Sequence, residues 1–372
     1  MAAFMDGNRA IALGALDAGC DFFAGYPITP ATEILLHLSR TLPETGGIVI
    51  QGEDEIASLG FCIGAAMSGR RAMTATSGPG ISLYSENIGL AIMGEVPLVI
   101  VDVQRMGPAT GAATTGAQGD TQFLRWGTSG GYPVIVLAPT TVRECYQLTL
   151  KAFQLAERFR LPVFLATDKE TAQTKTSLEL KRAEDAVPER KTAPAEEPFL
   201  PLGIEKLDQV PPMSPFGGPH ILRFTTSSHD ERGYLTKDPE DLDRLNRHLW
   251  EKIELHQEEI SLVEADLQEG ARHLILSYGI SARAARAALQ QARAAGKNVS
   301  LLTVHSLWPV PEKAIRQALE GIQTVILPEL NFGQYTREIE RLIDKDQEVI
   351  GVHRVDGRLI NAHQILEEGG LL

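Results

Sequence analysis

A threonine, a glutamate and an arginine have surroundings that suit chemistry. Thr29 lies between two prolines in the stretch GYPITPATE, just after the short apolar run 20–24. Pro27 and Pro30 limit the freedom of this turn and restrict the residues before them to extended conformations. One hydroxyl is therefore held at the end of a predicted strand, where open parallel sheets bind their ligands.

Glu55 opens the segment GEDEIASLGFCIGAAMSG, in which most other residues are apolar or small. The small residues of this predicted helix would let another backbone approach closely. A carboxyl group at such a surface is a candidate for proton transfer. The alternative is an acid that only complements the dipole of the helix N-terminus, and Glu53 and Asp54 suit that role better.

Arg105 directly follows the apolar run 97–103, so it is expected at the carboxyl end of a strand. Its guanidinium offers a two-pronged donor that matches a carboxylate. The segment VQRMGPATGAATTGAQGD has almost no bulk and must lie against something, and Thr110, Thr114 and Thr115 supply hydroxyls. A surface ion pair on a flexible loop remains the alternative for Arg105.

The stretch TSGPG at 76–80 is the nearest approach to a phosphate-binding loop. It lies between a predicted strand and a predicted helix, so its backbone N–H groups could meet a ligand, although a plain tight turn fits as well. Neither GxxxxGK[ST] nor a GxGxxG after the first strand is present, which argues against a nicotinamide dehydrogenase.

Charge and length exclude several classes of protein. The chain has 372 residues, which favours about two domains, and its formal net charge is −13. Such an acidic chain lacks the basic field that nucleic acids or anionic membranes require. We find no signal peptide and no apolar stretch of the roughly 18 residues that a membrane span needs.

The three cysteines are dispersed, and no CxxC pair occurs. This chain alone therefore cannot supply a zinc or iron–sulfur ligand set. Dispersed thiols indicate a reducing cytoplasm, and each is expected to be a small buried residue. They are Cys20, Cys62 and Cys145.

Unbroken apolar runs that alternate with helical patterns predict an α/β protein with a doubly wound parallel sheet over residues 1–170. Residues 171–267 read as a solvated charged connector, an irregular excursion and a long charged helix over 242–265. A second, smaller α/β unit is predicted over 268–372. The expected strands are 21–24, 47–51, 71–76, 97–103, 132–137, 162–166, 272–278, 299–304, 324–328 and 348–352; the expected helices are 8–18, 31–40, 54–68, 82–93, 141–158, 281–295, 312–320 and 334–343.

Four motifs in this order resemble the α subunit of 2-oxoacid:ferredoxin oxidoreductases: GYPITPATE, GEDEIASLGFCIGAA, TATSGPGISLYSENIG and VQRMGPATG. The form RMGPATG with the later QGD is most similar to the 2-oxoglutarate branch. The stretch SSHDERGYLTKDPE at 227–240 resembles the same subunits. The resemblance covers essentially the whole chain and implies a thiamine-diphosphate pyrimidine-binding domain, followed by a transketolase C-terminal-like domain concerned with assembly and coenzyme A.

The resemblance also implies roles for individual residues. Glu55 matches the glutamate that hydrogen-bonds the aminopyrimidine ring of thiamine diphosphate and is expected to be catalytic. Thr29 matches a threonine that faces cofactor and substrate, and Arg105 matches an arginine that meets a substrate carboxylate. Thr110 and Thr114 are expected to help bind the substrate. The remaining cofactor-binding candidates are Tyr26, Ser77, Gly78, Gly80 and Asn87.

The family's cofactors imply partner subunits. Thiamine diphosphate needs Mg²⁺, which the family holds with GDG and an Asn about 25–30 residues later. In this chain Thr121 follows Gly119-Asp120, and no Asn lies between Asn87 and Asn246. A β subunit is therefore expected to hold the diphosphate, Mg²⁺ and a [4Fe–4S] cluster. A ferredoxin-like δ subunit is expected to carry further clusters. A separate γ subunit is expected because the YPITP turn lies so near residue 1.

The expected reaction converts 2-oxoglutarate, coenzyme A and oxidised ferredoxin into succinyl-CoA, CO₂ and reduced ferredoxin. Run backwards it would fix CO₂, as in the reductive TCA cycle. One alternative keeps the family with pyruvate, a branched-chain or an aryl 2-oxoacid as substrate. The other is a non-catalytic assembly subunit, against which the presence of Thr29, Glu55 and Arg105 argues.

Overall fold

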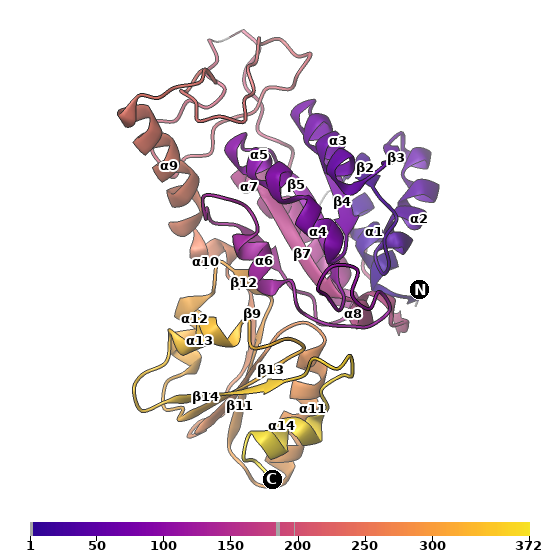
Figure 1. The fold of residues 1–372 in the computed structure, drawn as a ribbon, viewed down its shortest axis with the longest axis vertical. Helices are drawn as coiled ribbons and strands as arrows, with labels where there is room; N and C mark the ends of the chain where they lie inside the picture. Colours follow the sequence, from indigo (N-terminus) through magenta and orange to yellow (C-terminus); the bar gives the residue numbers. More distant parts are fainter. Residues whose placement is uncertain (1–2, 184–186, 197) are drawn as a thin grey trace.

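The computed structural model describes residues 3–183, 187–196 and 198–372. Within them the strands form a seven-stranded sheet, a five-stranded sheet and a two-stranded ribbon. Figure 1 shows the seven-stranded sheet in the upper half of the molecule and the five-stranded sheet in the lower half. The predicted α/β class, with a larger parallel sheet followed by a smaller one, is confirmed.

The larger sheet has the strand order β12-β6-β7-β5-β4-β2-β3. All its neighbours are parallel except β12, which runs antiparallel to β6 and comes from the second half of the chain. The sequence analysis did not predict this strand. The bounds are β2 (Phe22–Gly25), β3 (Ile48–Gln51), β4 (Ala72–Thr76), β5 (Leu98–Gln104), β6 (Ile135–Leu137), β7 (Pro162–Asp168) and β12 (Ser306–Trp308).

Helices pack on both faces of this sheet, because alternate side chains of a buried strand point to opposite sides. On β5, Leu98 and Ile100 pack in one core cluster with α3, α4 and α5, whereas Val99 and Val101 pack in another with α1, α2 and α7. The helices of this half are α1 (Gly7–Asp17), α2 (Thr32–Thr41), η1 (Pro43–Thr45), α3 (Glu55–Met67), α4 (Pro79–Leu83), α5 (Ser85–Met93), α6 (Thr121–Trp126), α7 (Val142–Phe159) and α8 (Lys169–Gln173).

Two helix predictions in this half need correction. The helix predicted over 82–93 is two helices, α4 and α5, which meet at Tyr84. The short α6 was not predicted, because it follows a Gly/Ala/Thr segment that has no helical periodicity. The three cysteines are buried free thiols, as predicted.

The five-stranded sheet has the order β14-β13-β10-β11-β9, with only β9 antiparallel. Helices α11 and α14 pack together on it. The bounds of the elements are β9 (Val263–Asp266), β10 (His273–Ser277), β11 (Val299–Val304), β13 (Thr324–Glu329), β14 (Glu348–His353), α11 (Ser281–Ala294), α12 (Glu312–Ala318), α13 (Thr336–Glu340) and α14 (Ala362–Glu368).

The long helix predicted over 242–265 is wrong in its second half. Helix α9 (Pro239–Glu254) ends at Glu254, α10 (Gln257–Ile260) follows, and Val263–Asp266 is the edge strand β9. A polar edge strand exposes much of its surface, so its charges resemble those of a solvated helix.

The connector is more firmly attached than a solvated segment would be. Strand β8 (Thr176–Leu178) pairs with β1 (Ala3–Met5), and neither was predicted. Arg190 forms an ion pair with Glu157 and donates to the carbonyl of Ala66. Residues 202–238 contain no helix or strand and lie beside α9 at the top of Figure 1. The described residues contain no helix that is long and apolar enough to cross a membrane.

Buried hydrogen bonds join the two halves of the molecule. The Gln118 amide nitrogen donates to the Tyr278 carbonyl, and the backbone N–H of Leu330 donates to the Gln118 side chain. Gln122 donates two further hydrogen bonds to Gln334, from its backbone N–H to Oε1 and from its side-chain amide to the backbone carbonyl. These hydrogen bonds hold the end of the Arg105 segment against the second half of the molecule. The domain boundaries near residues 170 and 267 stay a prediction.

Candidate functional site

The predicted site residues gather where three adjacent parallel strands end. Strands β2, β4 and β5 are neighbours in the sheet, so the segments that follow them leave the same edge. These segments carry Thr29, the glycines of TSGPG, and Arg105. The structure therefore brings together residues that lie far apart in the sequence.

Arg105 joins two of these segments. Its Nη1 donates to the backbone carbonyl of Thr29 at 2.6 Å, and its Nη2 donates to the carbonyl of Thr110 at 3.1 Å. The arginine is buried, and its Nε has no hydrogen-bond partner among the described residues. The surface-ion-pair alternative is therefore wrong, because the guanidinium holds the Thr29 turn and the Thr110 loop together.

Glu55 is the first residue of α3, but it is not the capping acid. Asp54 takes that role, since its carboxylate accepts the N–H of Ala57 at 2.7 Å. Glu55 is buried instead, with only 7% of its surface exposed. The sequence-based assignment of capping to Asp54 is confirmed, and the Glu55 carboxyl group is left for another use.

The glycine loop separates Glu55 from Arg105. A Cβ at Gly80 would overlap the Thr76 hydroxyl and come within 2.9 Å of Oε1 of Glu55. Gly78 has a φ of +30°, and a Cβ there would lie 3.6 Å from Cγ of Arg105. Glycine at both positions lets the backbone lie flat between the carboxylate and the guanidinium, which is the surface a planar ring needs.

Several buried polar atoms at this edge have no partner among the described residues. They include the hydroxyls of Thr76 and Ser77 and Nε of Arg105. Nearly all buried polar groups in native proteins are hydrogen-bonded, so such a group calls for a bound molecule or a functional reason. The edge therefore has unused hydrogen-bonding capacity close to Glu55.

The other predicted residues lie around this centre. Asn87 donates to the carbonyl of Ile56 at 2.9 Å and so fastens α5 beside Glu55. Tyr26 is 39% exposed, and the side chains of Thr29, Thr110 and Thr114 are also exposed. No hydrogen bond draws Thr114 to Arg105 in the described residues, whereas Thr110 is drawn there through its backbone.

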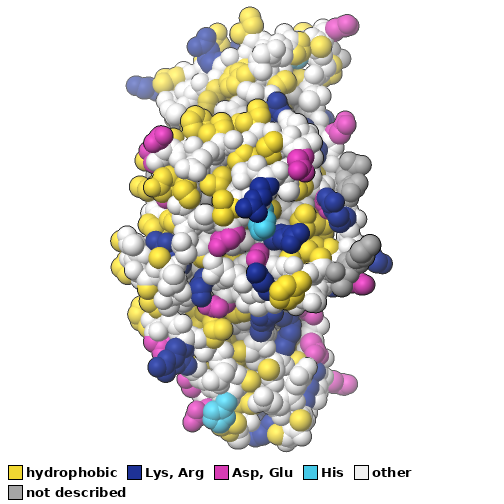
Figure 2. Space-filling model, turned by 90° about the vertical axis from the view of Figure 1, so that its right-hand side faces the viewer, with side chains coloured by type: hydrophobic (Ala, Val, Ile, Leu, Met, Phe, Trp, Pro, Cys, Tyr) yellow, Lys and Arg dark blue, Asp and Glu magenta, His cyan; other side chains and the backbone are white. Residues whose placement is uncertain are grey.

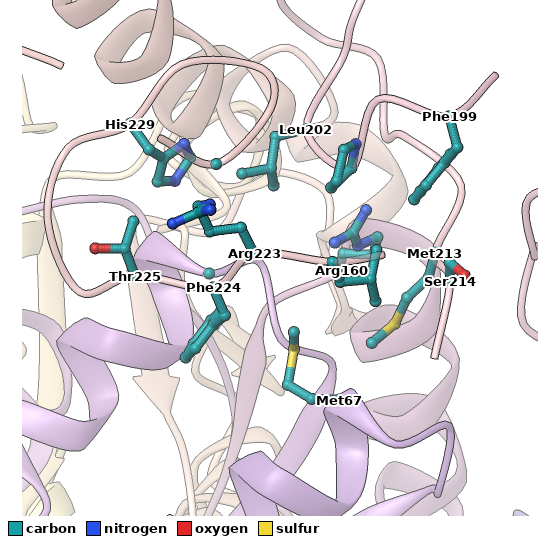
Figure 3. Close-up of a pocket in the computed structure, with 14 residues that line it drawn as sticks. Met67, Arg160, Phe199, Leu202, Met213, Ser214, Arg223, Phe224, Thr225 and His229 are labelled. Atoms are coloured by element: carbon teal, nitrogen blue, oxygen red, sulfur yellow. The ribbon is translucent and has the colours of Figure 1, made fainter. Parts of the chain in front are cut away.

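A separate hollow lies under the irregular segment, and Figure 3 shows Met67, Arg160, Arg223 and His229 around it. None of the predicted site residues lines it. The guanidinium of Arg160 is engaged by the carbonyls of Glu95, Pro211 and Pro212. This arginine therefore attaches the irregular segment and is not available to a ligand.

Comparisons with known proteins identify the family of this chain. A family model described as pyruvate flavodoxin/ferredoxin oxidoreductase, thiamine diphosphate-binding, matches residues 13–248. A second, described as pyruvate:ferredoxin oxidoreductase core domain II, matches residues 271–365. The chain belongs to the α subunits of the 2-oxoacid:ferredoxin oxidoreductases.

Two curated relatives of this α subunit differ in substrate. It is 41% identical over 368 residues to the 2-oxoglutarate synthase subunit KorA of Methanothermobacter thermautotrophicus, covering 98% of this chain and 96% of the relative. It is 37% identical over 363 residues to the ketoisovalerate oxidoreductase subunit VorB of the same organism, covering 97% and 95%.

Solved structures agree with the fold of the α subunit. A 2-oxoglutarate:ferredoxin oxidoreductase from Magnetococcus marinus, with 2-oxoglutarate, coenzyme A and succinyl-CoA bound, matches with a TM-score of 0.90 and 31% identity. The match covers 98% of this chain and 64% of that chain, so the α subunit spans less than two thirds of it. A split-gene transketolase matches with a TM-score of 0.55 and 11% identity, which supports a transketolase-like fold only.

Two acidic residues near the candidate site of this α subunit were not predicted from the sequence. Asp102 lies within the otherwise apolar strand β5 and is fully buried, and Asp120 lies at the start of α6. Burial and the adjacent Asp120 carboxyl group raise the pKa of Asp102 well above its ordinary value. Burial raises the pKa of Asp120 to about 6, which its neighbours Asp102 and Arg105 oppose. A charged residue inside LVIVDVQ was the sequence clue.

An exposed apolar surface adjoins Glu55 in the α subunit. Ile56, Phe61 and Leu83 on α3 and α4 are each about half exposed. A Cβ added at Gly60 or Gly64 would meet no atom within 4 Å. Further exposed apolar residues occur on α2 and β3, and Figure 2, viewed from that side, shows hydrophobic side chains over the upper half of the face. Several exposed apolar residues on one face are typical of a surface that another protein covers.

Proposed function

We propose that this chain is the α subunit of a complex that oxidises 2-oxoglutarate and coenzyme A to succinyl-CoA and CO₂ and reduces ferredoxin. One observation carries the proposal: Glu55 and Arg105 face the two sides of one glycine loop, at an edge with unused hydrogen-bonding capacity. The relatives named 2-oxoglutarate synthase match at up to 42% identity, against up to 37% for those named ketoisovalerate oxidoreductase.

The site fits the pyrimidine half of thiamine diphosphate, because Gly78 and Gly80 leave a flat backbone surface between buried polar groups. When bound, this cofactor would stabilise the negative charge left on the keto carbon as CO₂ departs. Glu55, Ser77, Gly78 and Gly80 would hold it. Tyr26 and Asn87 are proposed to support it, with Asn87 acting through its hydrogen bond to the start of α3.

The chain's own residues have separate tasks in this proposal. Glu55 holds and returns a proton at its carboxylate oxygen, which burial shields from water. Arg105 brings its positive charge beside the Thr29 turn and the Thr110 loop, where it would attract a carboxylate of the 2-oxoacid. The hydroxyls of Thr29, Thr110 and Thr114 are exposed and would orient the substrate.

The rest of the chemistry is assigned to partner chains. The described residues contain no group of three or more His, Cys, Asp or Glu side chains that could hold a metal ion. A β subunit is proposed to hold the diphosphate, Mg²⁺ and a [4Fe–4S] cluster, and to cover Ile56, Phe61 and Leu83. Separate γ and ferredoxin-like δ subunits are also proposed, with ferredoxin as acceptor. The proposed compartment is the cytoplasm, where thiols such as the three buried ones stay reduced.

A branched-chain 2-oxoacid is the second candidate substrate, because the VorB relative covers nearly the whole chain at 37% identity. Both candidates share the mechanism and differ in whether the substrate carries a second carboxylate. Pyruvate and aryl 2-oxoacids complete the panel.

The test purifies the complex through a tag on this chain and measures coenzyme A-dependent viologen reduction with each 2-oxoacid. We expect a cluster-bearing partner to co-purify and 2-oxoglutarate to give the highest kcat/KM. A higher value for 3-methyl-2-oxobutanoate would transfer the proposal to the branched-chain class. A complete complex that turns over none of the acids would favour the non-catalytic alternative. Tight binding of thiamine diphosphate by the chain alone would contradict the shared site.

A further inference from the structure

A fully buried carboxyl group, Asp102, and a half-buried one, Asp120, lie at the two ends of the segment 105–120. Asp102 is on β5, three residues before Arg105. Asp120 precedes α6, where its side chain caps no backbone N–H of the helix. Both oxygens of Asp102 and Oδ2 of Asp120 are buried, and none of them makes a hydrogen bond of normal geometry among the described residues. The two carboxyl groups are close enough to shift each other's pKa.

Few charged groups adjoin Asp102 and Asp120 to balance a negative charge on the pair. On the strands beside β5, the residues opposite Asp102 are Thr76 on β4 and Ala166 on β7, and neither is charged. The backbone amide of Gly78 lowers the pKa of Asp102, and the Arg105 guanidinium lowers that of Asp120.

Two further acidic residues, Glu55 and Asp168, lie near this edge of the sheet. Glu55 packs against Gly80 across the glycine loop. Asp168, at the end of β7, accepts the N–H groups of Thr171 and Ile280. Within residues 3–183, 187–196 and 198–372, the cation that acts on this pair is Arg105.

We propose that Asp102 and Asp120 are positioning residues, which share one proton and so fasten together the two ends of the 105–120 segment. This fastening holds Arg105 and Thr110 where the substrate carboxylate binds. The inference rests on the proposed function of Arg105. It adds a requirement which that function does not contain: the substrate-binding loop is in place only while the pair keeps a proton.

The electrostatics give the reason. Two ionised carboxylates side by side in a buried site repel each other, whereas one proton between them makes a charge-assisted hydrogen bond. The pair loses its first proton near pH 6, judged from the pKa of Asp120 at about 6. The second proton leaves at a higher pH, because its loss creates a second negative charge beside the first.

The backbone connects this pair to the loop. The N–H of Asp120 donates to Oε1 of Gln104 at 3.1 Å, so the segment returns to the residue from which it left. Arg105 follows Gln104 directly and reaches Thr29 and Thr110. The second sheet also holds the Asp120 end of the segment, through Gln118 and Gly119. Repulsion between Asp102 and Asp120 would therefore act against a fixed point and strain the end that carries Arg105.

The experiment measures KM and kcat for the 2-oxoacid from pH 6.5 to 9.5 in the purified complex, with whichever acid proves to be its substrate. For the unaltered complex we expect KM to rise about tenfold at alkaline pH while kcat changes less. In Asp120→Asn a neutral amide donates the hydrogen bond and cannot titrate. This variant should keep the neutral-pH KM within about threefold and lose the alkaline rise.

Asp120→Ala removes the hydrogen bond altogether and should raise KM about tenfold at every pH. Asp17→Asn is the matched control, since Asp17 is a buried aspartate that is bound by Tyr146 and lies outside the site. It should leave the pH profile of KM unchanged, whatever it does to stability.

Hydrogen–deuterium exchange of residues 105–120, corrected for the intrinsic pH dependence, provides a readout that does not need turnover. Exchange should increase at alkaline pH in the unaltered chain and not in Asp120→Asn. The inference would be overturned if KM still rose at alkaline pH in Asp120→Asn. It would also be overturned if the corrected exchange of residues 105–120 did not change with pH. If Arg105→Ala left KM unchanged while exchange of residues 105–120 still rose at alkaline pH, the proposed function would be overturned, and not the role of the pair.

Discussion

Two fully buried carboxylates, Glu329 and Asp102, lie toward the carboxyl ends of interior strands in the two sheets. Glu329 accepts hydrogen bonds from the Tyr278 hydroxyl and the Tyr335 N–H, and two more from Thr336, all at 2.7–2.8 Å. Neither oxygen of Asp102 makes a hydrogen bond of normal geometry among the described residues, and only the backbone amide of Gly78 lies near enough to lower its pKa. The same chemical group is saturated at one sheet and unsatisfied at the other.

This difference separates two uses of a buried charge. The saturated Glu329 fixes the geometry of β13 and the start of α13, and it has no capacity left for a ligand. The edge around Asp102, Thr76 and Arg105 keeps unused donors and acceptors, which destabilise the isolated chain but allow binding. The contrast predicts that substitutions at the first region act on stability and those at the second act on catalysis.

The largest effect is expected for Glu55→Gln. The amide keeps the size of the side chain but cannot transfer a proton, so kcat should fall about a thousandfold. Steady-state viologen reduction measures this loss, and size-exclusion chromatography checks that the complex still assembles. Full turnover in an intact complex would remove Glu55 from the catalytic role.

Glu329→Ala should give the opposite pattern. It leaves the donors of Tyr278, Tyr335 and Thr336 buried without an acceptor, which costs about 3 kcal/mol in the free energy of unfolding. Thermal unfolding followed by circular dichroism measures this change. Below the transition, KM for the 2-oxoacid should stay near its original value, and a KM change as large as that of a site variant would break the comparison.

Arg105→Ala tests a residue that is partly saturated and partly unsatisfied. Two of its nitrogens donate hydrogen bonds to the protein, and the third has no partner among the described residues. Loss of a charge-assisted contact with substrate should raise KM about thirtyfold, with a smaller change in kcat. Arg105→Lys should recover part of the loss, since a lysine retains the charge but cannot join both loops. Unchanged KM in both variants would contradict the assignment.

Gly80→Ala should have a smaller effect on activity than substitution of Glu55 or Arg105, about a tenfold fall in kcat. The added methyl overlaps the Thr76 hydroxyl and lies near Oε1 of Glu55, so both side chains must shift. Kinetics of the complex give the readout, and thermal unfolding provides the control. A tenfold loss that is accompanied by extensive unfolding would attribute the effect to the fold rather than to the displaced carboxylate.

The sequence predicted the buried parallel strands and placed Thr29 and Arg105 at strand ends, because apolar runs and strand ends are local patterns. The role of Glu55 came from the family resemblance and remains a proposal. The sequence analysis missed β12, β9 and β8, whose pairing depends on distant partners rather than on their own composition. It also missed Asp102 and Asp120. Their proximity results from the return of a loop, which residue spacing does not encode.

Strand β12 has a consequence for the synthesis of this protein. The edge of β6 is completed only by residues 306–308, which belong to the second half of the chain. On a ribosome that adds about 5–20 residues per second, roughly ten to thirty seconds pass between the emergence of β6 and that of its partner. During this interval the newborn sheet has an open edge, which is the kind of surface that chaperones protect from aggregation. A C-terminally truncated chain would keep that edge open permanently.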